Sequence, residues 1–296
     1  MRRDSFSEYH PGITFTFFIA AIVFGMCFIH PAFWISSVVL STAYVVSIRG
    51  RRAAKILLIL LILFLAVSLL NPMFTADGEH VLFLLPWGRP YTMEALCYGL
   101  AAGGMFVTVL LWFAAYNEVM SSDKFLFLFG RLMPSLSLVL TMILRLVPSF
   151  QRKMAQIVGA RKCIGMFGDV DRRSSINAGM AVTAALTSWA LEGGIITADS
   201  MQSRGFGVGK RSAFAVYRLE NRDVILLGVM ILLILVVLLC AFHGGMKTAY
   251  IPKIELAGTD VPYMITGMIA YVLFMAIPTA LNIVETVRWH YLKSKI

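Results

Sequence analysis

Residues 55–71 read KILLILLILFLAVSLLN, and this stretch decides the class of fold. It is bounded by Lys55 and Asn71, and every residue between them except Ser68 is apolar. A helix needs about 20 predominantly apolar residues, in a range of roughly 17–25, to cross the hydrocarbon core of a bilayer. The stretch therefore predicts a membrane-spanning helix.

Further apolar stretches lie on both sides of this one. Of the 296 residues, 59% are hydrophobic and 14% are charged, whereas a soluble domain carries about a quarter charged residues. We expect an all-α polytopic membrane protein with about six transmembrane helices. The expected spans are residues 13–29, 32–48 (a short one), 55–71, 94–116, 223–243 and 261–287.

The basic residues are distributed unevenly between the two sides of the membrane. With the N-terminus inside, only Arg89, Lys247 and Lys253 of the 26 lysines and arginines fall in outside loops. Cytoplasmic loops carry an excess of Lys and Arg, so we expect both termini to be cytoplasmic in a cell (plasma) membrane. The same rule explains the net charge of +10, and we expect no nucleic acid partner.

The expected spans divide the chain into three parts. Residues 1–117 hold the first four transmembrane helices, residues 118–222 form a cytoplasmic helical coupling region, and residues 223–296 hold the last two transmembrane helices.

The cytoplasmic region is expected to contain several helices. The ten residues 135–144 are apolar but too few to span, which suits a buried or interfacial helix. Apolar residues at helical spacing predict an amphipathic helix over 151–162. Another helix is expected over 176–203, which would be about 40 Å long if continuous, and Gly193-Gly194 favours a break or bend in it.

The last two of these helices end alike, with an arginine. Their final residues are Ala160-Arg161-Lys162 and Ser203-Arg204-Gly205. A glycine after a helix permits the left-handed conformation that stops it, and arginine offers a fixed fork of donors suited to carboxylates. Each end therefore presents a cation on a rigid rod. The alternative is a cation placed near the negative end of the helix dipole, worth ~0.3–1 kcal/mol.

Several kinds of chemistry have no motif in the chain. There is no Walker A motif, no GxSxG elbow and no metal-ligand spacing, which argues against an ATPase or a membrane protease. Ionisable groups, which transporters and pumps use, are nearly missing from the expected spans. The four cysteines are scattered and suit apolar packing. We expect no catalytic residue and no cofactor or metal bound by this chain.

The helix ends and their flanks carry a family resemblance. The chain resembles the transmembrane T component of energy-coupling factor (ECF) transporters, a class of ABC importers for vitamins, metal ions and other micronutrients. The resemblance covers most of the chain but is specific only over about 144–211. It rests on Leu144-Arg-Leu-Val-Pro148, on Ala160-Arg-Lys162, above all on Trp189-Ala-Leu-Glu192 and Ala198-Asp199 through Gly207, and on His10-Pro11 before the first span.

The resemblance implies a mechanism and a set of partners. In that family, two helices with Ala-Arg-Gly-like tripeptides dock into grooves of two cytoplasmic ABC-type ATPases, which bind ATP and magnesium. ATP binding moves both helices, and the motion rearranges a small membrane protein, the S component, which captures the substrate. Arg161 and Arg204 match the two arginines. Ser203 replaces the usual alanine, and Lys162 replaces the usual glycine.

The flanking matches imply supporting residues for the coupling helices, namely Arg145, Pro148, Glu192 and Asp199. Two other functions stay open. A conventional ABC importer permease has one cytoplasmic coupling loop, which Glu192-Gly-Gly faintly resembles. A stand-alone membrane carrier or enzyme transports or converts its substrate without partners.

Overall fold

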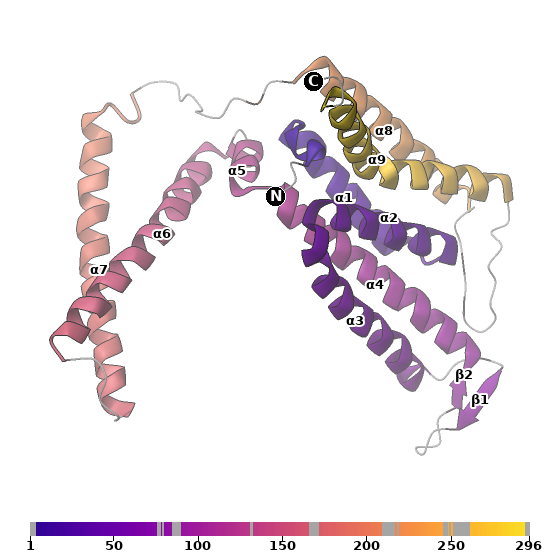
Figure 1. The fold of residues 1–296 in the computed structure, drawn as a ribbon, viewed down its shortest axis with the longest axis horizontal. Helices are drawn as coiled ribbons and strands as arrows, with labels where there is room; N and C mark the ends of the chain where they lie inside the picture. The colour runs from indigo at the N-terminus through magenta and orange to yellow at the C-terminus, as the bar shows by residue number, and fades with distance from the viewer. Residues whose placement is uncertain are drawn as a thin grey trace. The chain divides into compact units, whose positions relative to one another are not determined.

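The computed structural model of the chain describes residues 4–75, 78, 80–84, 90–130, 133–165, 172–208, 217, 219–244, 248, 250 and 261–293. These residues are predominantly helical (Figure 1). In chain order the elements are η1 (Ser5–Glu8), α1 (Pro11–Cys27), α2 (Pro31–Arg49), η2 (Gly50–Arg52), α3 (Ala53–Phe74), β1 (Val81–Leu84), β2 (Pro90–Thr92), α4 (Met93–Val119), α5 (Ser122–Gly130), α6 (Pro134–Cys163), α7 (Arg172–Ser203), α8 (Asn221–Phe242) and α9 (Val261–Lys293). The strands β1 and β2 form one antiparallel hairpin.

Five stretches of the described residues are long and apolar enough to cross a membrane. They are Pro31–Phe74, Met93–Val119, Ser175–Ser203, Asn221–Phe242 and Val261–Lys293. The first contains both α2 and α3, and α1 is a shorter apolar helix of 17 residues. The protein is thus an all-α polytopic membrane protein, which confirms the predicted fold class.

One of these stretches was not among the expected spans. Ser175–Ser203 lies in α7, which the sequence analysis placed in the cytoplasm, yet its length and composition alone suffice for crossing a membrane. It is the least apolar of the five stretches, and it carries Glu192 and Asp199.

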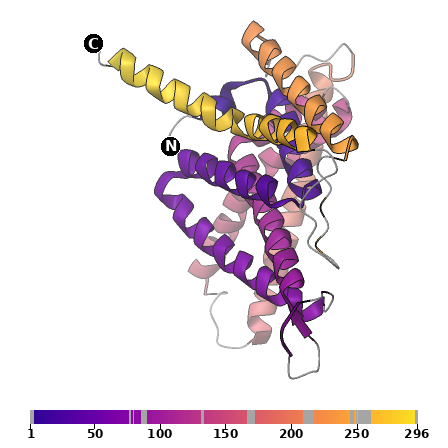
Figure 2. The same ribbon diagram turned by 90° about the vertical axis from the view of Figure 1, so that its right-hand side faces the viewer.

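The turn between α2 and α3 lies at the basic sequence Arg49-Gly-Arg-Arg. Gly50 has a φ of 55°, a left-handed value that glycine adopts without a Cβ penalty. The chain changes direction sharply there, so α2 and α3 form a V (Figure 2). Arg49 forms an ion pair with Glu118 at the end of α4, at 2.9 Å.

The chain divides into two compact units. Unit 1 comprises residues 1–125 and 217–296, and unit 2 comprises residues 126–216. Unit 1 therefore contains every helix before α5 and both helices after α7, whereas unit 2 contains α6 and α7.

Aromatic side chains form the centre of unit 1. The Phe17 ring of α1 packs against Trp112 of α4 and Phe274 of α9, with centroids 5.4 and 5.0 Å apart. The indole N–H of Trp112 donates to the Ser37 hydroxyl of α2 at 3.1 Å. Aromatic pairs contribute about 0.5–1.5 kcal/mol each beyond the area that they bury. The core therefore joins helices from both ends of the sequence.

Glycines bring α3 and α4 close together. A Cβ on Gly103 would lie 2.7 Å from the Ser68 hydroxyl, and one on Gly99 would lie 2.7 Å from the Ser68 carbonyl oxygen. Real Cβ atoms essentially never approach a neighbour this closely. Small residues at membrane helix interfaces let backbones approach in this way.

The helices of unit 2 are longer than the sequence analysis predicted. The separate helices expected over 135–144 and 151–162 are wrong, because α6 runs unbroken from Pro134 to Cys163 and includes Pro148. Proline lacks an N–H and removes one helical hydrogen bond, but Pro148 is exposed, where the freed carbonyl is not buried. At Gly193-Gly194, where a break or a bend was expected, α7 continues without a break.

Candidate functional site at two helix ends

The end of α7 is closed by a left-handed glycine. Gly205 has a φ of 78°. Its N–H donates to the Gln202 carbonyl at 3.0 Å, and the Phe206 N–H donates to the Met201 carbonyl at 3.0 Å. These two bonds together are the Schellman motif, which satisfies carbonyls at a helix C-terminus. The helix thus ends in a defined geometry with Arg204 at its cap.

The two residues before this glycine face solvent. The Ser203 hydroxyl donates to the Ser200 carbonyl at 3.0 Å, and the side chain of Arg204 is exposed. Arg204 forms no ion pair with any residue that the structure describes. Its guanidinium therefore keeps its donors for water or for a partner.

The end of α6 is also closed by a left-handed glycine, which lies three residues after Lys162. Gly165 has a φ of 74°, and its N–H donates to the Lys162 carbonyl at 3.1 Å. The Ile164 N–H donates to the Ala160 carbonyl at 3.3 Å. Lys162 is an ordinary exposed helical residue, so Gly165 stops the helix without a glycine at position 162.

The two arginines consequently occupy different places relative to their stops. Arg204 directly precedes its glycine, whereas Arg161 lies four residues before Gly165. Arg161 is half-buried, and its Nε is buried without a hydrogen bond to any described residue. The two ends are alike in their glycine stops but differ in how they present the arginine.

Aromatic contact marks the crossing of α6 and α7. The Phe150 ring meets the Trp189 ring edge-on, with centroids 5.5 Å apart. The Lys153 ammonium lies 5.9 Å from the centroid of the Trp189 ring, a cation–π distance. Within unit 2 the helices cross with their C-terminal ends at opposite ends of the pair (Figure 1).

The supporting residues lie along these two helices rather than at their ends. Arg145, Pro148, Glu192 and Asp199 are all exposed. Arg145, Glu192 and Asp199 form no ion pair within the described part of the chain. The Pro148 carbonyl accepts a hydrogen bond from Arg152 Nε at 3.3 Å. The structure does not bring these four residues together with Arg161 or Arg204 into one cluster.

A polar cluster in unit 1 escaped the sequence analysis. Asp4 accepts hydrogen bonds from the Asn282 amide at 2.6 Å and from the Tyr44 hydroxyl at 3.1 Å. Burial raises the pKa of Asp4 above its ordinary value, against these hydrogen bonds and the charge of Lys124, which lower it. Asn282 is 278 residues from Asp4 in sequence, so no local sequence pattern could predict the contact between them.

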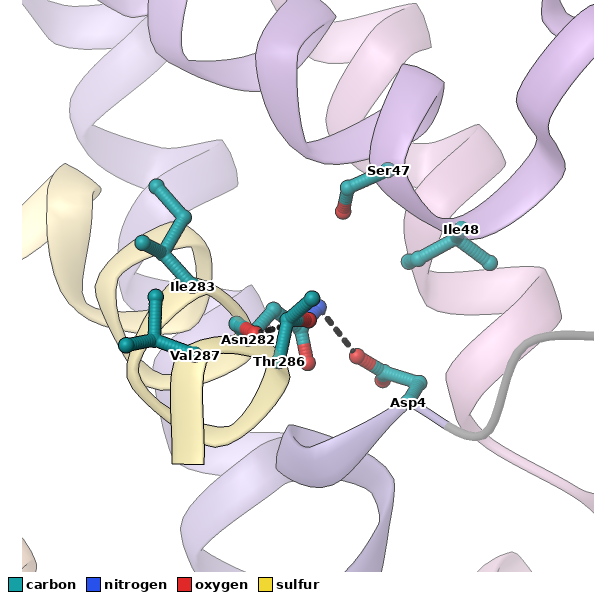
Figure 3. Close-up of a pocket in the computed structure, with 7 residues that line it drawn as sticks. All are labelled: Asp4, Ser47, Ile48, Asn282, Ile283, Thr286 and Val287. Atoms are coloured by element: carbon teal, nitrogen blue, oxygen red, sulfur yellow. Dashed lines mark hydrogen bonds between the residues drawn. The ribbon is translucent and has the colours of Figure 1, made fainter. Parts of the chain in front are cut away.

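A pocket of about 230 Å³ lies beside this cluster. Figure 3 shows the hydrogen bond between Asp4 and Asn282 at the pocket. The pocket is lined by Asp4, Ser47, Ile48, Asn282, Ile283, Thr286 and Val287. Both Asp4 carboxylate oxygens already accept hydrogen bonds from the protein, so we assign Asp4 a structural role that joins the N-terminal segment to α2 and α9.

No group of three or more metal-ligating side chains occurs among the described residues. The cysteines Cys27 and Cys163 are exposed, whereas Cys240 is buried, and all four are free thiols. A comparison with protein-family models finds no match to this chain. A comparison with curated proteins likewise finds no relative.

Proposed function

We propose that this chain is the transmembrane coupling subunit (T component) of an ECF-type ABC importer. Its partners are two cytoplasmic ABC-type ATPases and a small S component, all assembled on a lipid bilayer. The ATPases bind ATP and magnesium, and the S component captures a vitamin, metal ion or other micronutrient. The chain itself is not an enzyme. Both of its termini lie in the cytoplasm, in accordance with the distribution of its basic residues.

The observation that carries the proposal is the pair of crossing helices. Each is stopped by a left-handed glycine, and each bears an arginine within its last turn or at its cap. Arginine forms bidentate, charge-assisted hydrogen bonds with carboxylates. Two such ends suit two acidic grooves, one on each ATPase.

The geometry of unit 2 suggests how motion passes through the pair. The helices have 30 and 32 residues, which corresponds to about 45–48 Å at ~1.5 Å per residue. They meet at Phe150 and Trp189. When the ATPases close, the two ends move with their grooves and the helices rotate about this crossing. The S component follows because it rests on the exposed apolar side chains of the same helices.

This proposal places α7 at the cytoplasmic membrane surface instead of across the bilayer. Glu192 and Asp199 are exposed on α7. A charged side chain near the bilayer centre, where a spanning α7 would place Glu192, disfavours insertion, and the apolar character of α7 is the weakest among the candidate spans. An interfacial position keeps both carboxylates in water.

The test is affinity purification of the tagged chain in mild detergent, followed by mass spectrometry. Wild-type protein should carry two P-loop ATPases and a small hydrophobic protein. The double variant Arg161→Ala/Arg204→Ala should lose the ATPases, because loss of a hydrogen-bonded charge pair at an interface costs about 2–5 kcal/mol.

The matched control is Arg51→Ala/Arg52→Ala, which removes two exposed arginines of unit 1 and should retain both ATPases. A double variant that assembles like wild type contradicts the proposal. Recovery of a soluble substrate-binding protein would indicate a conventional permease, and transport or turnover by the chain alone would indicate a carrier or an enzyme.

A further inference from the structure

The chain leaves unit 1 after Phe125 and returns to it at Tyr217. Both connections attach to the same short piece of unit 1, residues 4–10, which we name the N-terminal segment. The departing connection attaches through Lys124. The returning connection attaches through Tyr217 and Arg222. These contacts do not involve Arg161, Arg204 or the helix ends that carry them.

Lys124 holds the departing connection. Its side chain is only 7% exposed. Its ammonium donates to the Ser7 hydroxyl at 2.9 Å, to the Ser7 carbonyl, and to the Val119 carbonyl at 3.1 Å. These bonds occupy all three donors of the ammonium. A buried charge is costly unless it is fully hydrogen-bonded, so the position of Ser7 determines where the chain enters α5.

Aromatic contacts hold the returning connection. The Arg222 guanidinium lies 5.3 Å from the centroid of the Tyr9 ring, a cation–π distance. The Tyr217 ring stands edge-on to His10, with centroids 6.5 Å apart. Arg222 belongs to the first turn of α8, so the start of that helix is joined to the same segment as Lys124.

The N-terminal segment is in turn fixed to the membrane helices. Asp4 binds Tyr44 of α2 and Asn282 of α9, and the Ser5 N–H donates to the Asn282 amide oxygen at 2.9 Å. Phe6 is fully buried and packs edge-on against Phe17 of α1. A displacement of the segment therefore acts directly on three helices of the core.

We propose that residues 4–10 are a common anchor that links both connections of unit 2 to α2 and α9, with Lys124 and Arg222 as the positioning residues. Displacement of the coupling helices passes into the membrane core through this anchor. The second statement rests on the proposed function, whereas the link between the two connections does not.

The link is tested by hydrogen exchange on the purified full chain in detergent, with no partner present. Lys124→Met removes the ammonium and keeps an unbranched apolar side chain. Exchange should become about tenfold faster in residues 5–10 and also in residues 219–224, since a hydrogen bond to a charged group is lost. Lys55→Met removes an exposed lysine of α3 and should change neither region.

A second variant changes the returning connection at a residue that is not buried. Arg222 is about half exposed, so Arg222→Gln should fold, and it should speed exchange in residues 5–10 and 119–125. The common anchor is refuted if Lys124→Met leaves exchange in residues 219–224 unchanged, or if Arg222→Gln leaves exchange in residues 119–125 unchanged. Either result would show that the two connections are independent.

The coupling role is tested in the assembled complex with AMP-PNP and magnesium, which need no knowledge of the substrate. In wild type the nucleotide should alter exchange in α6 and α7 and also in α2 and α9. In Lys124→Met the change in α2 and α9 should disappear while that in α6 and α7 remains. An unchanged response in α2 and α9 overturns the coupling role. If the wild-type chain recruits no ATPase, the proposed function fails. The exchange test on the isolated chain still shows whether residues 4–10 link the two connections.

Discussion

The indole ring of Trp189 meets the ring of Phe150 edge-on, with centroids 5.5 Å apart, where α7 crosses α6. Both rings are only half-buried, and among the described residues of unit 2 the buried hydrophobic side chains are Ala178 and Val182, both on α7. The crossing therefore depends on a small contact area, in contrast to the aromatic core of unit 1.

Trp189→Ala should loosen the crossing. The ring pair contributes about 0.5–1.5 kcal/mol beyond its buried area, so proteolysis of α6 and α7 should become several-fold faster. Trp189→Phe keeps a ring and should cause a smaller change, and Ile195→Ala, at an exposed position of α7, should cause none. Equal cleavage rates for Trp189→Ala and wild type would show that the helices are held together by other contacts.

Gly205→Ala should fray the end of α7. A left-handed backbone costs an L-residue roughly 1–2 kcal/mol, and Gly205 has a φ of 78°. The amide of Phe206, bonded to Met201, should then exchange faster with solvent. Gly193→Ala is the matched control, because a Cβ there meets nothing within 4 Å and alanine favours the helix by about 0.5–1 kcal/mol. Slower or unchanged exchange at Phe206 would argue against a closed end.

The position of α7 relative to the bilayer can be measured by cysteine labelling. In a variant without the four native cysteines, Glu192→Cys should react with a membrane-impermeant maleimide in inside-out vesicles but not in intact cells, because an interfacial α7 keeps this position in water. Glu192 is exposed near the middle of the stretch Ser175–Ser203. Ile62→Cys, exposed halfway along α3, should stay unlabelled from both sides because lipid covers it. The absence of labelling at Glu192→Cys from both sides would place α7 across the membrane.

Asp4 should make the stability of the chain depend on pH. Burial raises its pKa above the ordinary value of 3.8, so the folded chain holds this proton more tightly than the unfolded chain does. The free energy of unfolding therefore falls as pH rises from about 3.8 through the raised pKa. Asp4→Asn cannot ionise and should flatten this part of the profile of apparent Tm against pH. Glu8→Gln, at an exposed carboxylate, should leave the slope as in wild type, and a slope that survives Asp4→Asn would assign it to another group.

Composition and apolar runs were enough to predict the fold class, because a bilayer-spanning helix can be recognised from one continuous apolar stretch such as residues 55–71. Rules about single residues were less reliable. Separate helices were expected over 135–144 and 151–162, but α6 runs through Pro148, and α7 continues through Gly193-Gly194. A single proline or glycine lowers the stability of a long helix without necessarily ending it.

Contacts between distant parts of the chain could not be predicted. Lys124 stands in the polar sequence Ser-Ser-Asp-Lys and has the character of a surface lysine, yet it is buried against Ser7. The C-terminal end of α6, in contrast, was predicted to within one residue: the helix was expected to end at Lys162 and ends at Cys163. The left-handed glycine after it is Gly165.

The glycine contacts of α3 and α4 restrict how the membrane part can rearrange. Gly99 and Gly103 leave no room for a side chain beside Ser68, and a tightly packed interface resists sliding because every displacement creates a clash or a void. The α3–α4 pair should thus move as one rigid body. Any conformational change within the bilayer must then take place in the other helices. The interface between α3 and α4 also leaves no space for a bound small molecule.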